Sequence, residues 1–422
     1  MKYKILVVHP GKQHSYRLAS ALKKGGLLYK YITTIYNKEG SIFNKIIKIF
    51  LSEDNKKRLE SRKNKDLIDN EVLELCKYGG LIETLLYRID KNKRIYNKIH
   101  DYNADRFGLK VAKYAIKNNI DIVIAYDTNA LVCFEYLKNN SPSIIKVLDV
   151  SIIARPYMKE IYEKECKKTK TNYLYNSNLY LWNKYKMSRL QKEIDNSDYF
   201  LAASNVVRDS LIYSGVKKEQ VKLVPYGANV ISNLKKSKLI QKEIRFLFVG
   251  QVVYRKGISY LLECMEELEN SKLTIVGNCS NEEYILKYKN YKNIKFTGLV
   301  TFDKMKKIYE TNDVFIIPSF AEGMAQVGIE AMACGLPVIC TYNSGISDLI
   351  IEGENGFVVK AGNKEELLEK MKWFIKNNEK IIEMGEKAKE ISKKYTWKEY
   401  EKNIINCFLE ILKSEKNEKD EL

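Results

Sequence analysis

Short apolar runs alternate with amphipathic stretches along almost the whole chain. In the first half the runs "KILVV", "DIVIAY" and "IIKVLDV" are each followed by a segment with helical spacing of its apolar residues, as in "SYRLASALKKGG". After the polar stretch "ISNLKKSKLIQKE", a second series runs from "IRFLFVG" through "KLTIVG", "IKFTG", "VFIIPS" and "LPVICT" to "GFVV". Strands that alternate with helices favour parallel sheets covered on both faces. The pattern therefore predicts an α/β protein with two doubly wound, Rossmann-like domains in tandem.

The 422 residues are too many for one ordinary core, which also favours two domains. We place an N-terminal domain at residues 1–232 and a C-terminal domain at residues 244–396, with a terminal helix and charged tail at 397–422 that returns towards the first domain. Ligands of such sheets bind beyond the carboxyl ends of the strands. The cleft between two facing sheets is therefore the expected active site.

The chain is strongly basic, with a net charge of +19. Such a surface attracts polyanions, which include nucleic acid, anionic membranes and phosphorylated small molecules, although lysines scattered over the surface give the same charge. Residues 41–65 and 164–192 mix lysines with apolar or aromatic residues, so each predicts either an interfacial helix or a helix packed on its own domain. Because no nucleic-acid-binding motif occurs, nucleic acid is not an expected partner.

The spacing of the cysteines is typical of a protein in a reducing compartment. None of the eight forms a Cys-x-x-Cys pair or has a His at metal-ligand spacing, so they indicate reduced, buried residues and no metal site. No run approaches about 20 apolar residues, and "MKYKILVVHP" is typical of a first strand rather than a signal peptide. We expect a cytoplasmic protein, with the charge leaving open a peripheral position at the inner face of the membrane.

The stretch "FAEGMAQVGIEAMACG" at residues 320–335 carries two glutamates. Glu322 falls in the loop after a buried strand, and Glu330 about two turns into a helix. The amides of Met324, Ala325 and Gln326 fall at the start of that helix, where free N–H groups and the helix dipole favour an anion. The alternative is that both glutamates are merely exposed, since this spacing alone is common.

A second loop adds cations at another strand end. In "FLFVGQVVYRKGISYLL" a strand ends at Gly250, and Arg255 and Lys256 precede the next helix. The stretch is neither a dinucleotide fingerprint nor a P-loop. Two adjacent cations at a strand end can clamp a diphosphate, although a solvated basic turn has the same pattern.

Together these residues resemble the nucleotide-sugar half of the family 4 glycosyltransferases, a retaining family of group 1 type with the GT-B fold. Arg255 and Lys256 match the family's Arg/Lys pair, and Glu322 and Glu330 match its Glu-x7-Glu motif. The resemblance spans about residues 195 to 400. The first 190 residues fit only loosely.

The resemblance implies roles for the donor-side residues. Arg255 and Lys256 would neutralise the diphosphate of the leaving nucleotide, Glu322 would hold sugar hydroxyls, and Glu330 the ribose hydroxyls. The donor-binding residues it implies also include Gly298 and Leu299 near the base, and Gly250, Gly323, Met324, Ala325 and Gln326 around the phosphates. No Asp-x-Asp triplet occurs, which fits a metal-free mechanism with no cofactor besides the donor substrate.

The first domain departs from the family pattern. "HPGKQHS" has one glycine where the family has a pair, so Gly11 and Lys12 are the residues expected to approach the donor phosphate. No His follows "IIKVLDV", where the family often places one. Asp149, Ser151 or Arg155 therefore takes that place, and Asp149 and Ser151 are the catalytic candidates there. His9 and His14 fall near the cleft, and His100 is expected at the surface.

We expect a retaining glycosyltransferase that moves a sugar from a nucleotide-diphosphate sugar, such as a UDP-sugar, to a glycan or lipid-linked acceptor of cell-envelope polysaccharide or glycolipid synthesis. An anionic membrane surface is a further partner suggested by the charge. The alternatives are another GT-B enzyme (a nucleotide-sugar 2-epimerase or a phosphorylase) and a non-catalytic glycan- or polyanion-binding scaffold.

Overall fold

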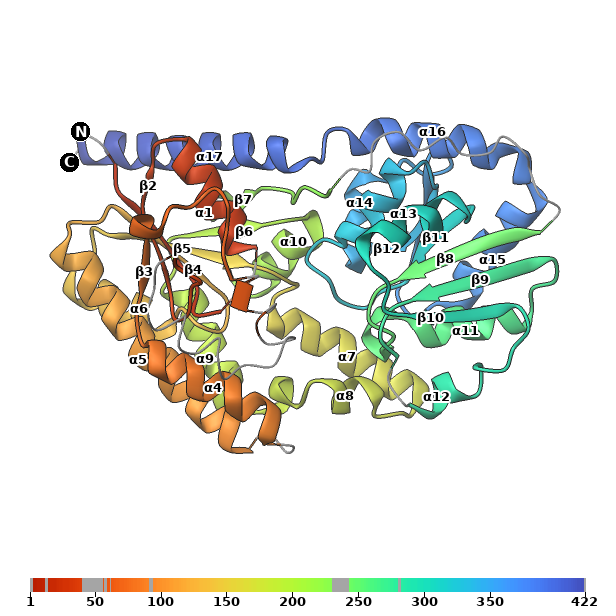
Figure 1. The fold of residues 1–422 in the computed structure, drawn as a ribbon, viewed down its shortest axis with the longest axis horizontal. Helices are drawn as coiled ribbons and strands as arrows, with labels where there is room; N and C mark the ends of the chain where they lie inside the picture. The colour runs from red at the N-terminus through yellow and green to blue at the C-terminus, as the bar shows by residue number, and fades with distance from the viewer. Residues whose placement is uncertain are drawn as a thin grey trace.

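A computed structural model describes residues 3–11, 14–39, 56, 59–60, 62–90, 94–229, 243–279 and 282–420. Two sheets, each built only from parallel strand pairs, form the centres of two lobes (Figure 1). Most of the predicted helix at residues 41–65, and Lys12, lie outside the described residues.

The first sheet has seven strands in the order β3-β2-β1-β4-β5-β6-β7. These are β1 (Ile5–Val8), β2 (Leu28–Thr33), β3 (Val72–Glu74), β4 (Ile122–Tyr126), β5 (Ile145–Val150), β6 (Tyr199–Ala202) and β7 (Val221–Leu223). The helices in this half of the chain are α1 (Ser15–Lys24), α4 (Lys77–Ile89), α5 (Arg94–Lys117), α6 (Leu131–Asn140), α7 (Arg155–Thr169), α8 (Tyr173–Ser177), α9 (Lys184–Asp195) and α10 (Asn205–Tyr213). The central strands β1, β4 and β5 are buried along their whole length, as expected of strands covered on both faces.

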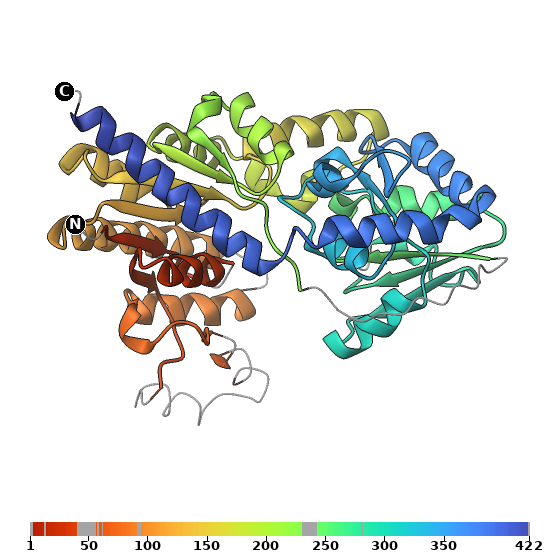
Figure 2. The same ribbon diagram turned by 90° about the horizontal axis from the view of Figure 1, so that it is seen from above.

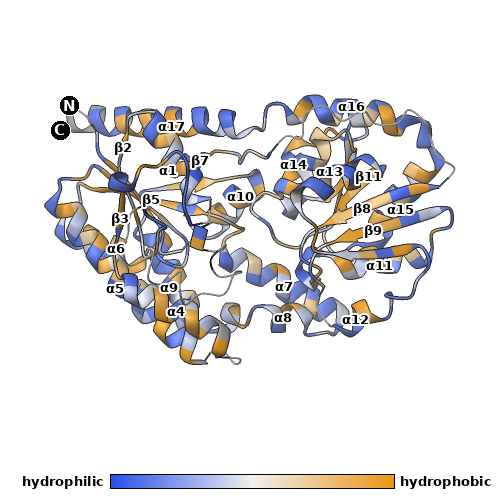
Figure 3. Ribbon diagram, viewed as in Figure 1, coloured by the Kyte–Doolittle hydropathy of each residue, from blue (hydrophilic) through white to orange (hydrophobic). Residues whose placement is uncertain are grey.

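The second sheet has six strands in the order β10-β9-β8-β11-β12-β13. These are β8 (Ile244–Val249), β9 (Ser271–Val276), β10 (Ile294–Gly298), β11 (Val314–Ile317), β12 (Val338–Thr341) and β13 (Gly356–Val359). The helices in this half are α11 (Ile258–Glu266), α12 (Glu283–Leu286), α13 (Phe302–Glu310), α14 (Gln326–Ala333), α15 (Lys364–Lys376), α16 (Ile381–Ser392) and α17 (Trp397–Asp420). Apolar residues dominate β8, whereas polar and apolar residues alternate along α17 (Figure 3).

The strand order reverses between β1 and β4 in the first sheet and between β8 and β11 in the second. Such a reversal opens a crevice at the carboxyl ends of the two central strands, where doubly wound proteins bind ligands. The predicted fold class, an α/β protein with two Rossmann-like doubly wound domains, is therefore confirmed. No described helix combines the length and the apolar character needed to cross a bilayer.

The C-terminal helix α17 returns to the first domain, as predicted, and lies along it in both ribbon views (Figures 1 and 2). Lys24 of α1 forms an ion pair with Glu401 at 2.7 Å, and the guanidinium of Arg17 lies 4.8 Å from the ring centroid of Trp397. The helix therefore joins the end of the chain to its beginning.

The segment of α7 and α8 behaves differently from its neighbours in sequence. In the sequence this segment comes between β5 and β6 of the first sheet. Its buried side chains Met158, Tyr162 and Leu174 nevertheless belong to the same apolar cluster as Phe246 and Phe320 of the second domain. The ring of Tyr173 stacks on Tyr254, with centroids 5.2 Å apart. These side chains therefore pack inward, but into the core of the second domain and not on their own domain alone, which the alternative to an interfacial helix predicted.

Candidate functional site

The predicted cations and the first glutamate lie on both sides of the crevice in the second sheet. Arg255 and Lys256 form the short 3-10 helix η4 (Tyr254–Lys256) after β8, and Glu322 follows β11. Gly257 ends η4 with φ +70°, and a Cβ at this position would lie 1.9 Å from the carbonyl oxygen of Pro318. Only glycine therefore lets the two loops approach so closely.

These three side chains meet directly. Arg255 Nη1 and Lys256 Nζ each lie 2.6 Å from Glu322 Oε1, and Arg255 also donates to the carbonyl oxygen of Ala321. The Glu322 side chain is only 13% exposed, so the alternative of a freely exposed loop residue does not hold. Burial lowers the pKa of Lys256, an effect that Glu322 opposes. Two cations share one carboxylate here, which leaves an excess positive charge for an anionic ligand.

The loop that opens α14 offers fewer free amides than the sequence predicts. The amide of Ala325 donates to the carbonyl oxygen of Ser344 at 3.0 Å, so the prediction of a free amide is wrong at Ala325. Within the described residues, the amides of Met324 and Gln326 donate to no acceptor. The donor-binding role of this loop stays a prediction that rests on those two groups.

Glu330 lies further along α14 and has a different partner. The hydroxyl of Tyr309 in α13 donates to Glu330 Oε2 at 3.2 Å, and burial raises the pKa of Glu330. At the end of β10, Gly298 has φ +69° and Leu299 is 80% exposed. Gly250, at φ +154°, ends β8 beside η4. These positions place the predicted nucleotide-binding residues along one edge of the sheet.

The first domain contacts the main chain of the loop that carries Glu322. A Cβ at Gly323 would lie 2.1 Å from the carbonyl oxygen of Ser151, and the amide of Ile153 donates to the carbonyl oxygen of Glu322 at 3.3 Å. Ser204 Oγ donates to the carbonyl oxygen of Gly323 at 2.5 Å. Ser151, predicted as a catalytic residue, therefore meets the loop through its carbonyl group. Its catalytic role stays a prediction.

Asp149 lies in a polar cluster at the carboxyl end of β5. It is 2% exposed, and its Oδ2 lies 3.2 Å from Nε2 of His14. The hydroxyl of Tyr226, which follows β7, lies 2.9 Å from the same nitrogen. The sequence predicted Asp149 and placed His14 near the cleft, but it offered no local signal for Tyr226, which only the fold brings to this point.

His9 and Gly11 form the neighbouring turn after β1. The amide of Gly11 donates to Nδ1 of His9 at 2.9 Å, and burial lowers the pKa of His9 to about 4. His9 is therefore a neutral residue that shapes the turn. The ring of Tyr126 lies edge-on to His9 and to His14, with centroids 5.0 and 5.1 Å away.

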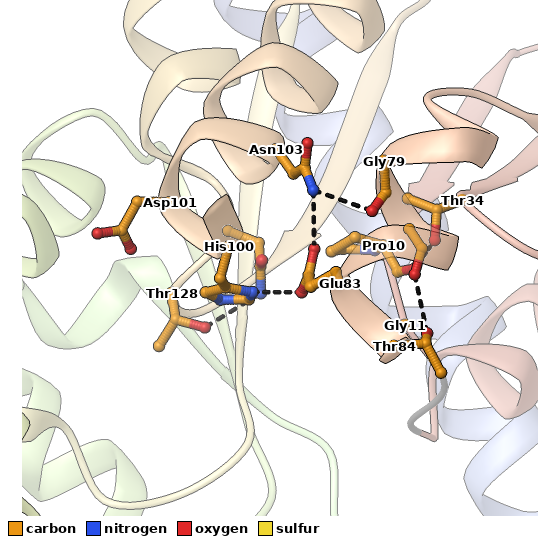
Figure 4. A network of polar contacts seen from close by, with 12 residues as sticks. Pro10, Gly11, Thr34, Gly79, Glu83, Thr84, His100, Asp101, Asn103 and Thr128 are labelled. Atoms are coloured by element: carbon orange, nitrogen blue, oxygen red, sulfur yellow. Dashed lines mark hydrogen bonds and ion pairs between the residues drawn. The ribbon is translucent and has the colours of Figure 1, made fainter. Parts of the chain in front are cut away.

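His100 is less exposed than predicted. Its Nδ1 lies 2.5 Å from Glu83 Oε1, its side chain is 33% exposed, and the hydrogen bond to Glu83 raises its pKa (Figure 4). Asn103 donates to the carbonyl oxygen of Gly79 in the same contact between α4 and α5. The pair joins α4 to α5, and His100 lies in neither polar cluster described above.

The fold and the paired cations at the second crevice define a GT-B type protein. Residues 230–391 match the family of "Glycosyl transferases group 1". The match assigns these residues, which include most of the second domain, to the family and confirms the resemblance found in the sequence.

Relatives and solved structures agree with this assignment. An uncharacterized glycosyltransferase of Methanocaldococcus jannaschii is 29% identical over 230 residues, which cover 51% of this chain and 60% of the relative. The capsular polysaccharide biosynthesis glycosyltransferase CapM of Staphylococcus aureus is 29% identical over 238 residues, which cover 50% of this chain and 61% of the relative. The matched segments thus span less than two thirds of these relatives.

Solved structures match the whole fold. Sucrose-phosphate synthase from Thermosynechococcus elongatus superimposes with a TM-score of 0.67 at 15% identity, covering 98% of this chain and all of that one. Anabaena HepE in complex with UDP gives 0.62 at 17% identity, with coverage of 98% and 100%. At this identity the likeness concerns the fold.

Proposed function

We propose that the protein is a retaining glycosyltransferase that transfers a sugar from a nucleoside-diphosphate sugar to a glycan or lipid-linked acceptor. The observation that carries the proposal is the meeting of Arg255, Lys256 and Glu322 at the crevice of the second sheet. Negative charge grows on the diphosphate as the glycosidic bond breaks, and fixed cations stabilise that charge most where water is excluded. The two cations supply this stabilisation in the proposed mechanism without a metal ion.

Glu322 would change partners when the donor binds. A diphosphate that engages Arg255 and Lys256 competes with the carboxylate for both cations. The released Glu322 oxygen then accepts hydrogen bonds from sugar hydroxyls, since a carboxylate can only accept. In this proposal Glu322 pairs with the two cations in the free protein and orients the sugar in the complex.

The proposed donor is a UDP-sugar. Support comes from a protein of the same fold that has been solved with UDP. Glu330 would accept from the ribose hydroxyls in place of Tyr309, and the exposed Leu299 beside Gly298 would cover one face of the base. The amides of Met324 and Gln326 would contact the phosphates from the start of α14.

The first domain would supply the acceptor side. Asp149, His14 and Tyr226 form a buried polar cluster at the carboxyl ends of its strands, where an acceptor hydroxyl can be oriented. Because a similar protein acts in capsular polysaccharide biosynthesis, we propose an acceptor of cell-envelope polysaccharide or glycolipid synthesis.

We further propose a cytoplasmic protein that contacts an anionic membrane surface. All eight cysteines are free thiols, which suits a reducing compartment. Helix α4 exposes Tyr78, Ile82, Leu85 and Ile89, at 73%, 51%, 58% and 63%, and their spacing places them on one side of the helix. An apolar helix face on a chain of charge +19 is suited to the interface of an anionic bilayer.

The release of nucleoside diphosphate from UDP-, GDP- and ADP-sugars tests the proposed activity. We expect slow release from one donor by the wild type and a loss of about 10²-fold or more in Lys256→Ala, by analogy with the removal of one oxyanion donor. Lys272→Ala is the matched control, because Lys272 is a half-exposed lysine of the same domain that pairs with Glu243.

The alternatives give different products. Conversion of one nucleotide sugar into its epimer without net release of diphosphate would support the 2-epimerase. Tight binding of glycans with no turnover of any donor would support the scaffold.

A further inference from the structure

Helix α7 is anchored in one domain at its start and in the other at its end. Arg155, its first residue, forms an ion pair of 3.2 Å with Asp127, which follows β4 of the first sheet. At its last turn, Lys168 donates to the carbonyl oxygen of Gly362 beyond β13, and its ammonium lies 5.4 Å from the ring centroid of Tyr260. Figure 1 shows α7 and α8 crossing from one lobe to the other.

Glu165 is the buried charge of this helix, with 5% exposure. Its Oε1 accepts hydrogen bonds from the hydroxyls of Tyr254, at 3.0 Å, and Tyr260, at 2.5 Å. A carboxylate so deeply buried is tolerated only with such donors. A Cβ at Gly362 would lie 2.7 Å from Glu165 Oε2, so the main chain of the second domain also packs closely against this carboxylate.

The two tyrosines bracket the cation turn. Tyr254 is the first residue of η4, directly before Arg255 and Lys256, and Tyr260 lies in α11 directly after it. The ring of Tyr254 also stacks on Phe320, with centroids 6.0 Å apart and an interplanar angle of 16°. Phe320 in turn donates its amide to the carbonyl oxygen of Arg255 at 2.8 Å. Both loops that meet at Glu322 are therefore packed against one tyrosine whose hydroxyl is held by Glu165.

We propose that Glu165 is a positioning residue for the Arg255–Lys256 pair. The inference rests on the proposed function, since the pair is the proposed diphosphate clamp. Glu165 fixes Tyr254 and Tyr260, and these fix the turn between them. Because Glu165 belongs to a helix that starts in the first domain, the clamp holds its geometry only while α7 is docked. The first domain thereby contributes to donor binding through a residue, Glu165, that does not itself touch the donor.

The test compares three substitutions in the full chain. Glu165→Leu removes the acceptor, Glu165→Gln keeps an oxygen acceptor with the same shape, and Glu163→Leu makes the same chemical change at a side chain of α7 that is 43% exposed. We measure the Kd for UDP, GDP and ADP by titration calorimetry, and kcat and KM for the donor that the wild type uses.

We expect Glu165→Leu to weaken nucleotide binding by about tenfold or more, as the loss of hydrogen bonds to a buried charge implies. Glu165→Gln should stay within about threefold of the wild type, since an amide oxygen still accepts from both hydroxyls. Glu163→Leu should bind as the wild type does. Equal binding by the wild type and Glu165→Leu overturns the inference while leaving the proposed function in place. A wild type that binds none of the three nucleotides overturns both.

A double-mutant cycle separates positioning from general stability. If Glu165 acts through the clamp, Glu165→Leu costs little further affinity in a Lys256→Ala background, because coupled residues are not additive. Full additivity contradicts the proposal. Should Glu165→Leu fail to fold, Tyr254→Phe keeps the ring stack and removes one hydroxyl. We expect it to weaken nucleotide binding severalfold, and no loss in that variant overturns the proposal.

Discussion

Glu322 is bound through one oxygen by two cations, and this arrangement depends on small residues around it. Gly257 and Gly323 both lie where a Cβ would meet a main-chain oxygen, of Pro318 and Ser151 respectively. Substituting either would push apart the segments that it joins. At the scale of residues, the site depends on glycines, which have no side chain to hold the segments apart, as much as on its charged residues.

Asp149 gives a residue-scale prediction for the first domain. Asp149→Asn keeps the shape but replaces the carboxylate that contacts His14 and Tyr226, so the group that orients the imidazole is altered. We expect kcat to fall by about 10²-fold with little change in KM for the donor, a magnitude usual for groups that assist proton transfer. Steady-state kinetics with Asp195→Asn, at an exposed position of α9, provide the comparison. An unchanged kcat would remove Asp149 from the mechanism.

Glu193 gives a pH-dependent prediction. It is 3% exposed and accepts from the amides of Thr128, Ala130 and Leu131 at the start of α6, and burial raises its pKa to about 7. The unfolded chain ionises this group near its ordinary value of 4.5, so between that value and about 7 the native state binds more protons. The contribution of Glu193 to the free energy of unfolding therefore falls as pH rises through this window and is constant above it.

Urea unfolding of the wild type and Glu193→Gln across pH 4.5 to 7 measures this contribution. We expect the unfolding free energy of the wild type to fall steadily relative to that of Glu193→Gln as pH rises. The hydrogen bond from Thr128 alters the size of the difference but not its slope. A pH-independent difference would show that Glu193 titrates at an ordinary pKa.

At the scale of elements, α17 is a long helix whose apolar side is used against the first domain. Phe408 is fully buried, and the next residue, Leu409, is 38% exposed. A Cβ at Gly25 would lie 2.9 Å from Cγ1 of Ile405, which shows how closely α1 and α17 approach. The helix therefore closes the core of the domain in which the chain begins.

This close packing predicts the cost of opening the contact. We expect Phe408→Ala to lower the free energy of unfolding by about 3–5 kcal/mol, as is usual when a large buried ring is removed. Leu409→Ala, one residue away on the exposed side, should cost about 1 kcal/mol or less. Urea unfolding checks both, and similar costs for the two variants would contradict the assigned face of the helix.

At the scale of the whole molecule, the charge of +19 and the apolar side of α4 both support the proposed contact with an anionic membrane surface. We expect the protein to float with vesicles that contain anionic lipid at low salt and to be released at high salt, because exposed charges are screened. Leu85→Asp should abolish flotation. Leu286→Asp, an equal change at a 44% exposed residue of α12, should not. If the wild type does not float with anionic vesicles at low salt, the proposed membrane contact is wrong.

Much of the paired-cation site in the second domain could be predicted from the sequence. Arg255, Lys256 and Glu322 stand next to strand ends that the hydrophobic pattern locates, and a parallel sheet brings such ends to one edge. The free amide predicted at Ala325 is wrong because Ser344, from the next strand-helix connection, accepts its hydrogen bond. The partners Tyr226 and Tyr309 come from distant segments with no local signal, so no pattern around Asp149 or Glu330 could reveal them.

The sequence by itself determined the fold class, the alternation of elements and the chemical nature of the cation pair and the two glutamates, because these follow from local periodicity and from motifs within a few residues. Only the tertiary structure decided that Arg255 and Lys256 share one oxygen of Glu322, that Gly323 lies against Ser151, and that Glu165 holds the tyrosines around the cation turn. Each of these contacts joins segments far apart in the chain. Their geometry is set by packing between elements and domains, which periodicity along the sequence does not encode.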